Sequence, residues 1–133
     1  MKRALHILSV GQCGMDAGAI ASLFTDRFAA KVDHADSAAD ATSKFATGSY
    51  SLVLVNRVFD ADGFSGLKLI ESLLSTKSST AAPGSSQLKC PIMLISDRAD
   101  AQAAAVAIGA VRGFGKSSLR SPATAAAITA VLQ

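Results

Sequence analysis

The chain has 133 residues, of which 50% are apolar and 17% are charged, so it can bury one hydrophobic core and is too apolar to be disordered. Its formal net charge is +3, but the basic residues are scattered among acidic ones, which argues against nucleic acid as a partner. No apolar run approaches the roughly 20 residues that span a bilayer, and the first residues lead into a strand pattern rather than a signal peptide. We therefore expect one cytoplasmic domain over residues 1–133, with no membrane segment.

Strand and helix patterns alternate along the first half of the chain. Residues 4–10 form a nearly continuous apolar run that ends in a glycine, which is typical of a parallel strand buried on both faces. Asp16 is the predicted N-cap of a helix with apolar residues at helical spacing. Residues 31–35 predict a short strand, and Ser37 predicts the N-cap of a second helix. Residues 50–55 form the strongest strand pattern in the chain.

The alternation continues in the second half. Ser65 or Gly66 opens a third predicted helix, and the polar segment 75–89, which contains proline and glycine, predicts a long flexible loop. The remaining predicted elements are a strand at 91–96, an Ala-rich helix at 99–108, a strand at 111–114 and a helix that begins at Ser121-Pro122 and runs to Leu132. Five strands alternating with five helices predict an α/β fold with a doubly wound parallel sheet.

Particular residues stand where the predicted strands end. Gly11 and Gln12 follow the first strand, Asn56 ends the third, Ser96 ends the fourth and Lys116 follows the fifth. With this pattern the whole chain resembles the response-regulator receiver family of two-component phosphorelay signalling. The resemblance implies a flavodoxin-like, CheY-like sheet with strand order 2-1-3-4-5 and a site at the carboxyl ends of the strands.

The chain departs from that family at the residues that carry its chemistry. In receivers an acidic pair follows the first strand and a phosphorylated Asp ends the third, whereas this chain has Gly11, Gln12 and Asn56. An amide cannot form an acyl phosphate, and Mg²⁺ requires oxygen ligands that include carboxylates. We therefore expect a degenerate phosphorylation pocket without catalytic residues, metal or cofactor, in which Lys116 faces the amide of Asn56.

Two further features of this region affect the expected function. Gly113 stands at the position of the family's aromatic switch residue, and we expect the adjacent Phe114 to point into the core, so that the switch is fixed in one state. Asp60 and Asp62 lie in the loop after Asn56 and are either substitute acceptors and metal ligands or ordinary turn residues.

The Ala-rich helices suggest a partner surface. The resemblance implies an interface on the fourth helix, fifth strand and fifth helix, where Ala103 and Ala107 would permit close approach; the alternative is that alanine is there for its helix propensity. The resulting prediction is an atypical receiver, or pseudo-receiver, that acts by phosphorylation-independent binding of a protein partner in a signalling pathway. A homodimer through the fourth and fifth helices is one form of this prediction.

A binding function of another class remains open. The loop from Gly11 to Gly18 precedes a helix, and helix N-termini attract anions, so this loop with Arg57 and Lys116 could form a small-anion or nucleotide sensor. The spacing of the glycines matches neither common phosphate-binding loop. Cys13 and Cys90 have no metal-binding spacing and are expected to be free thiols.

Overall fold

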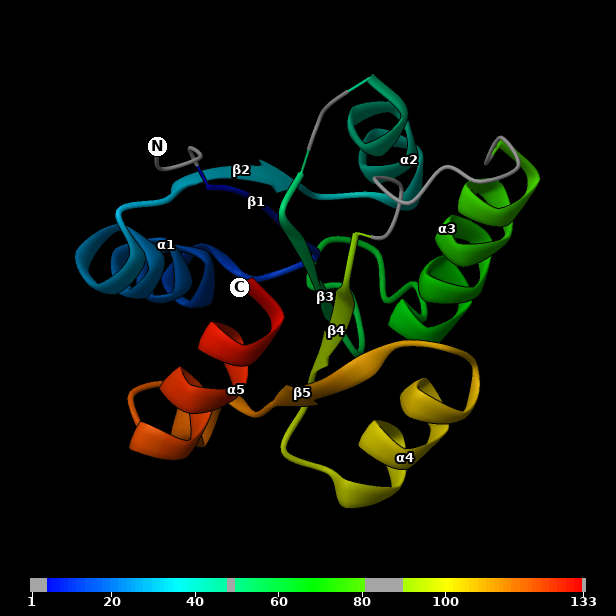
Figure 1. The fold of residues 1–133 in the computed structure, drawn as a ribbon. Coiled ribbons are helices and arrows are strands. Elements are labelled where there is room, and N and C mark those ends of the chain that lie inside the picture. Colours follow the sequence, from blue (N-terminus) through cyan, green and yellow to red (C-terminus); the bar gives the residue numbers. More distant parts are fainter. Residues whose placement is uncertain (1–4, 48–49, 81–89, 133) are drawn as a thin grey trace.

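The computed structural model describes residues 5–47, 50–80 and 90–132 and confirms the predicted fold class. All strand pairings are parallel, and the sheet order is β2-β1-β3-β4-β5 (Figure 1). The strands are β1 (His6–Val10), β2 (Lys31–Ala35), β3 (Leu52–Asn56), β4 (Ile92–Ile95) and β5 (Val111–Phe114). The helices are α1 (Gly14–Phe28), α2 (Ala38–Thr47), α3 (Gly66–Thr80), α4 (Ala99–Ala107) and α5 (Pro122–Leu132).

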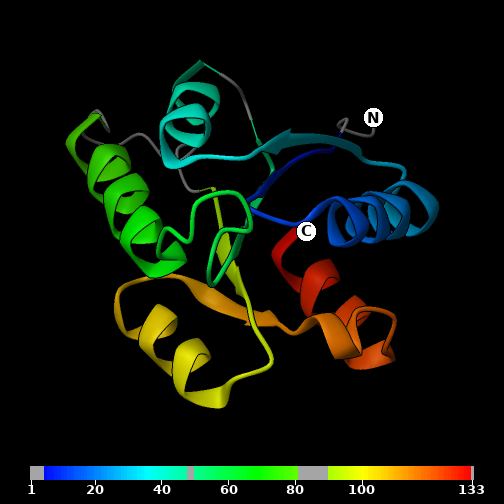
Figure 2. The same cartoon turned by 180° about the vertical axis from the view of Figure 1, so that it is seen from behind.

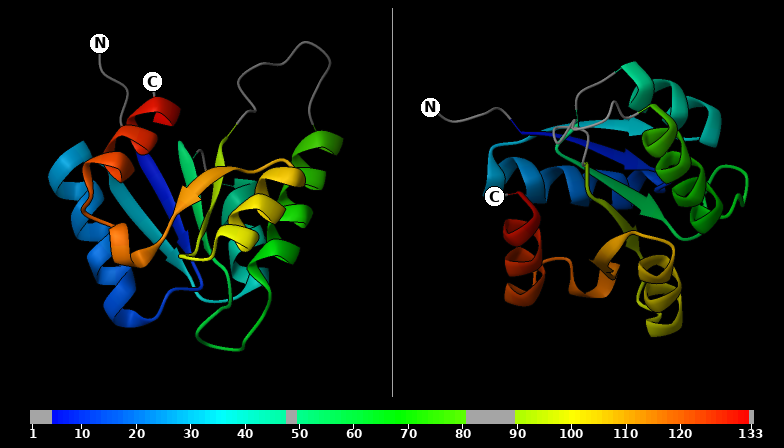
Figure 3. Two further views of the ribbon diagram at one scale, coloured as in Figure 1. Left: turned by 90° about the horizontal axis from the view of Figure 1, so that it is seen from below. Right: turned by 45° about the vertical axis from the view of Figure 1, so that its right-hand side comes forward.

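Helices cover both faces of the sheet. Helices α1 and α5 lie on one face and α2, α3 and α4 on the other, as the views from opposite sides show (Figures 1 and 2). Every residue of the central strand β3 is buried, which is why its sequence is a continuous apolar run. The carboxyl ends of the strands meet at one edge of the molecule, which the further views show (Figure 3).

Helix caps correct one prediction and confirm two. Cys13, not Asp16, is the N-cap of α1, because the Asp16 N–H donates to the Cys13 Sγ atom at 3.4 Å. Asp16 lies in the first turn instead, where a carboxylate interacts favourably with the helix dipole. Ser37 caps α2 by accepting the N–H of Asp40 at 3.1 Å. Ser121 likewise accepts the N–H of Thr124 at 3.2 Å at the start of α5.

The loop predicted over residues 75–89 is shorter at its start than expected. Helix α3 continues to Thr80, because residues 75–80 contain neither proline nor glycine to end it. The rest of that prediction, residues 81–89, lies outside the described residues. No helix in the described ranges is long and apolar enough to span a membrane.

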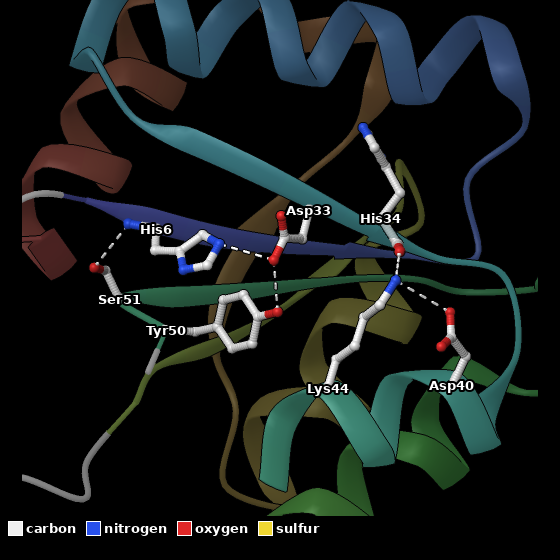
Figure 4. Close-up of polar contacts among 7 residues, drawn as sticks. All are labelled: His6, Asp33, His34, Asp40, Lys44, Tyr50 and Ser51. Carbon is white, nitrogen blue, oxygen red and sulfur yellow. Dashed lines mark hydrogen bonds and ion pairs between the residues drawn. The ribbon is translucent and has the colours of Figure 1, made fainter. Parts of the chain in front are cut away.

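A polar cluster joins the amino ends of β1 and β3 to β2 (Figure 4). His6 Nε2 and the Tyr50 hydroxyl both contact the same Asp33 oxygen, at 2.8 and 2.9 Å. The rings of His6 and Tyr50 pack at a centroid distance of 4.5 Å. The Ser51 hydroxyl accepts the His6 backbone N–H at 3.2 Å. These contacts tie the three strands together at the end of the sheet opposite the predicted site.

Candidate functional site: the pocket at the carboxyl ends of the strands

A pocket of about 410 Å³ lies at the carboxyl ends of the strands. Its lining comes from the start of α1, the end of β3 and the loop after it, the end of β4 and the residue after Gly115. Asn56, Ser96 and Lys116 are among the lining residues, as predicted from their places at the strand ends. Gly11 and Gln12 are buried and do not line it.

Asn56 uses its amide to hold the neighbouring loop. Its side chain is 8% exposed, and Nδ2 donates to the Gly11 carbonyl oxygen at 2.9 Å. Helix α3 begins close behind it, since a Cβ on Gly66 would lie 2.1 Å from the Asn56 carbonyl oxygen. Asn56 therefore has a structural bond that a carboxylate, which has no N–H, could not make.

Gly11 is covered by the ring of Phe59. Its φ is +77°, and a Cβ built on it would lie 2.5 Å from the Phe59 ring. Phe59 is 1% exposed and belongs to the hydrophobic core. The Gly11 carbonyl also accepts the Asp60 N–H at 3.0 Å, so the loop after β3 closes over this position. A side chain, acidic or otherwise, does not fit at residue 11 while Phe59 is in place.

Gln12 is likewise turned away from the pocket. It is 7% exposed, and Nε2 donates to the Val10 carbonyl at 3.3 Å. Its Oε1 atom is buried and has no hydrogen-bond partner among the described residues. Neither position after β1 presents an oxygen ligand to the pocket.

Lys116 pairs with Asp16 and not with Asn56, which corrects the expected contact. The Lys116 Nζ atom lies 2.7 Å from the Asp16 carboxylate, which also accepts the Cys13 thiol at 3.2 Å. The hydrogen bond from Lys116, followed by the one from Cys13, lowers the pKa of Asp16 from its ordinary value. A charge-assisted bond is stronger than a bond to a neutral amide, which explains the choice of partner.

The residues after β4 are bonded to one another and to the segment after β5. Ser96 Oγ accepts the Arg98 backbone N–H at 3.1 Å, and the Ser117 hydroxyl donates to Asp97 at 2.6 Å. The Arg98 guanidinium forms two bonds to the Asp100 carboxylate. Of the three cationic side chains that line the pocket, only Arg57 lacks an ion pair within the described part of the chain. This arrangement does not favour the anion-sensor alternative.

The two candidate substitute acids have different surroundings. Asp60 lines the pocket. Asp62 does not, and its Oδ1 accepts the Phe64 N–H at 3.0 Å in a local turn. Within residues 5–47, 50–80 and 90–132, no group of three or more His, Cys, Asp or Glu side chains is placed to hold a metal ion.

Gly113, the predicted switch position, and the candidate interface lie on the β5 side. Phe114 is 6% exposed and packs in the core, as expected, whereas a Cβ on Gly113 would lie 2.1 Å from the Leu94 carbonyl oxygen. Ala103 and Ala107 are exposed on α4, and α4 and α5 flank β5 (Figure 1).

Comparison with known proteins bears on the fold. No protein-family model matches the chain, and no curated protein matches it by sequence. Among solved structures, NtrX from Brucella abortus is 16% identical with a TM-score of 0.72, over 98% of this chain and 28% of that one. The signal receiver domain of the DNA binding response regulator protein merR from Colwellia psychrerythraea 34H is 20% identical with a TM-score of 0.71, over 97% and 99% of the two chains.

A third similar structure contains a phosphorylated aspartic acid. It is a response regulator protein from Burkholderia pseudomallei with a phosphorylated aspartic acid, calcium ion and citrate, 20% identical over 97% of this chain and 66% of that one, with a TM-score of 0.66. The present chain spans about a quarter of the length of the NtrX chain. Its fold is that of response-regulator receiver domains.

Proposed function

We propose that this chain is a receiver-like domain of a cytoplasmic signalling system that binds a protein partner without being phosphorylated and has no enzymatic activity. The observation that carries the proposal is the bond from Asn56 Nδ2 to the Gly11 carbonyl at 2.9 Å. At the end of β3 the chain offers an amide already engaged with the backbone, and an amide forms no acyl phosphate.

The carboxylates that remain in the pocket do not replace the missing ones. Asp16 is held by Lys116, and Asp97 accepts the Ser117 hydroxyl. Asp60 is exposed, lines the pocket and has no ion pair among the described residues. Mg²⁺ prefers near-ideal octahedral oxygen coordination, and proteins usually bind it through one or two carboxylates together with water and phosphate oxygens. Because Asp16 and Asp97 are already bonded to other side chains, the pocket is a poor site for the Mg²⁺ that phosphoryl transfer to a receiver would use.

The partner surface in this proposal is the side formed by α4, β5 and α5. Helix α4 exposes Ala103, Ala107 and Val106, the last at 44%. Small side chains allow another backbone to approach closely, and the apolar surface gains from burial. A second copy of the chain is the partner that we propose to test first.

Incubation with acetyl phosphate and Mg²⁺, followed by mass spectrometry, tests the first half of the proposal. We expect no added phosphoryl group, under conditions that label the Burkholderia pseudomallei response regulator. The variant Asn56→Asp should also remain unlabelled, because positions 11 and 12 still supply no carboxylate. A stable phosphoryl group on any Asp of the wild-type pocket would overturn this part.

Substitution of the α4 surface tests the second half. Ala103→Arg and Ala107→Arg place a bulky charge on the proposed contact, whereas Ala46→Arg makes the same change on an exposed position of α2. We expect the apparent mass of the wild type in sedimentation equilibrium to rise with protein concentration. The same rise should be seen for the α2 control and should be absent for the two α4 variants. A wild-type protein that is monomeric at all concentrations would rule out the homodimer.

A further inference from the structure

Gln102 is a buried amide within the Ala-rich helix α4. It is 4% exposed, and its side chain reaches the backbone of two strands. Nε2 donates to the carbonyl oxygens of Leu94 at 2.9 Å and Ser96 at 3.1 Å, and Oε1 accepts the N–H of Gly113 at 2.9 Å. Both amide protons and the carbonyl oxygen of Gln102 are therefore bonded, all to backbone atoms of the segments around β4 and β5.

These bonds fall where the ladder between β4 and β5 is irregular. Met93 is paired with Val111, but Ile95 is paired with Phe114, so β5 has one more residue than β4 between the two pairs. Such a bulge leaves backbone groups without ladder partners. Buried backbone groups that stay unpaired cost stability, and the carboxamide of Gln102 supplies partners on both strands.

The bulge also explains the glycine at the switch position. A Cβ on Gly113 would lie 2.1 Å from the Leu94 carbonyl oxygen, which is the same oxygen that Gln102 binds. The backbone can approach this closely only at glycine. Gln102 and Gly113 are thus two parts of one arrangement, in which α4 is fastened to both strands next to the proposed partner surface.

We propose that Gln102 is a clamp that fixes α4 to β4 and β5 and holds this side of the domain in a single arrangement. Its carboxamide is the positioning group, because it bonds Leu94, Ser96 and Gly113 at once. The clamp goes beyond the function proposed above and requires no partner. The tests of the clamp therefore do not depend on whether the chain forms a homodimer or accepts a phosphoryl group.

The wild-type protein allows a direct test. A long-range HNCO experiment detects coupling across a hydrogen bond, and we expect a correlation between the Gly113 amide nitrogen and the Gln102 side-chain carbonyl carbon. Absence of this correlation in a spectrum that shows the neighbouring backbone bond from Ser96 N–H to the Phe114 carbonyl would overturn the proposal.

Hydrogen exchange in a matched pair of variants measures the consequence. Gln102→Met keeps the side-chain length and removes every hydrogen bond, and Gln12→Met makes the same change at another buried glutamine. In Gln102→Met the Gly113 amide should exchange about tenfold faster while the amides of β1 and β3 keep their rates; in Gln12→Met the Gly113 amide should be unchanged. Unchanged exchange at Gly113 in Gln102→Met, or equal acceleration of all slow amides, would contradict a local clamp.

Discussion

Each end of the sheet carries a cluster of paired polar side chains, and the cluster at the carboxyl ends lies beside a pocket. At the amino ends, His6 and Tyr50 stack and share one oxygen of Asp33 (Figure 4). At the carboxyl ends, Lys116 and Asp16 are paired at 2.7 Å beside a pocket of about 410 Å³.

The carboxyl end shows that a pocket does not by itself supply reactive groups. The pocket lies at the carboxyl ends of the strands, but several of its polar side chains already have partners, such as Lys116 with Asp16 and Asp97 with Ser117. The amino-end cluster shows the same mutual pairing of polar side chains. A pocket at the carboxyl ends of the strands is therefore not by itself evidence of phosphoryl transfer, because the reaction needs groups that are free to react.

The largest expected effect concerns the closed position at Gly11. Gly11→Ala places a methyl group against the Phe59 ring, whereas Gly63→Ala has a similar φ of +72° and nothing within 4 Å. We expect urea denaturation to show a loss of about 3 kcal/mol for Gly11→Ala and about 1 kcal/mol for Gly63→Ala, since only the first adds overpacking to backbone strain. Equal losses would mean that the Phe59 ring moves aside at little cost and that a side chain does fit at residue 11.

The next effect compares the two acids at the centres of the clusters. Asp33→Ala leaves two partly buried donors without their acceptor, and we expect a loss of about 2 kcal/mol. Asp16→Ala should cost about 1 kcal/mol or less, because the Lys116 side chain is 37% exposed and can be solvated. Denaturation of the two variants under the same conditions checks the order, and a larger loss for Asp16→Ala would reverse the comparison.

Acid pH should weaken both clusters. The bond from Lys116 lowers the pKa of Asp16. Burial is the largest influence on Asp33 and raises its pKa, but bonds from Tyr50 and His6 together with nearby charges lower it overall. Because both folded pKa values lie below those of the unfolded chain, each contribution is present above the unfolded pKa near 3.9 and is lost as the pH falls through the folded pKa.

Denaturation midpoints measured between neutral pH and about pH 3 test this acid dependence. The variants Asp16→Asn and Asp33→Asn should each have a shallower decline than the wild type. An unchanged slope in either variant would show that its carboxyl does not contribute to the acid loss of stability.

The last comparison concerns the alkaline titration of Tyr50, the only tyrosine in the chain. Burial, followed by the bond to Asp33, raises the pKa of Tyr50 to about 12. The raised pKa stabilises the fold below the unfolded value near 10, and this contribution is lost as the pH rises towards 12. Tyrosinate absorbance should therefore titrate later in the folded protein than in urea, and earlier in Asp33→Ala than in the wild type; coincident curves would contradict the cluster.

Much of the fold could be predicted because short strand patterns alternate with helix patterns along the chain. Residues 31–35 and 111–114 were predicted with the bounds that the structure has, and the sheet order followed from the family resemblance. The start of α1 was placed wrongly, since cysteine is not among the usual N-cap residues.

The candidate site was less accessible to sequence reasoning. The places of Asn56 and Lys116 could be predicted from the strand ends, but the pair between Asp16 and Lys116 joins residues 100 positions apart and has no local pattern. The ring of Phe59 over Gly11 is equally non-local. Gln102 did leave a signal, because it is an amide among the alanines of α4; its burial could not be predicted without the packing of that helix.

The central claim is that the pocket is closed to phosphoryl chemistry, and an NMR titration with beryllofluoride and Mg²⁺ tests it most directly. We predict that the amide resonances of Asn56, Ser96 and Lys116 do not move, because beryllofluoride requires a carboxylate acceptor and Asn56 presents an amide bonded to Gly11. Saturable shifts of these resonances that depend on both reagents would show that another acid, such as Asp60, takes the acceptor's place, and would contradict the account.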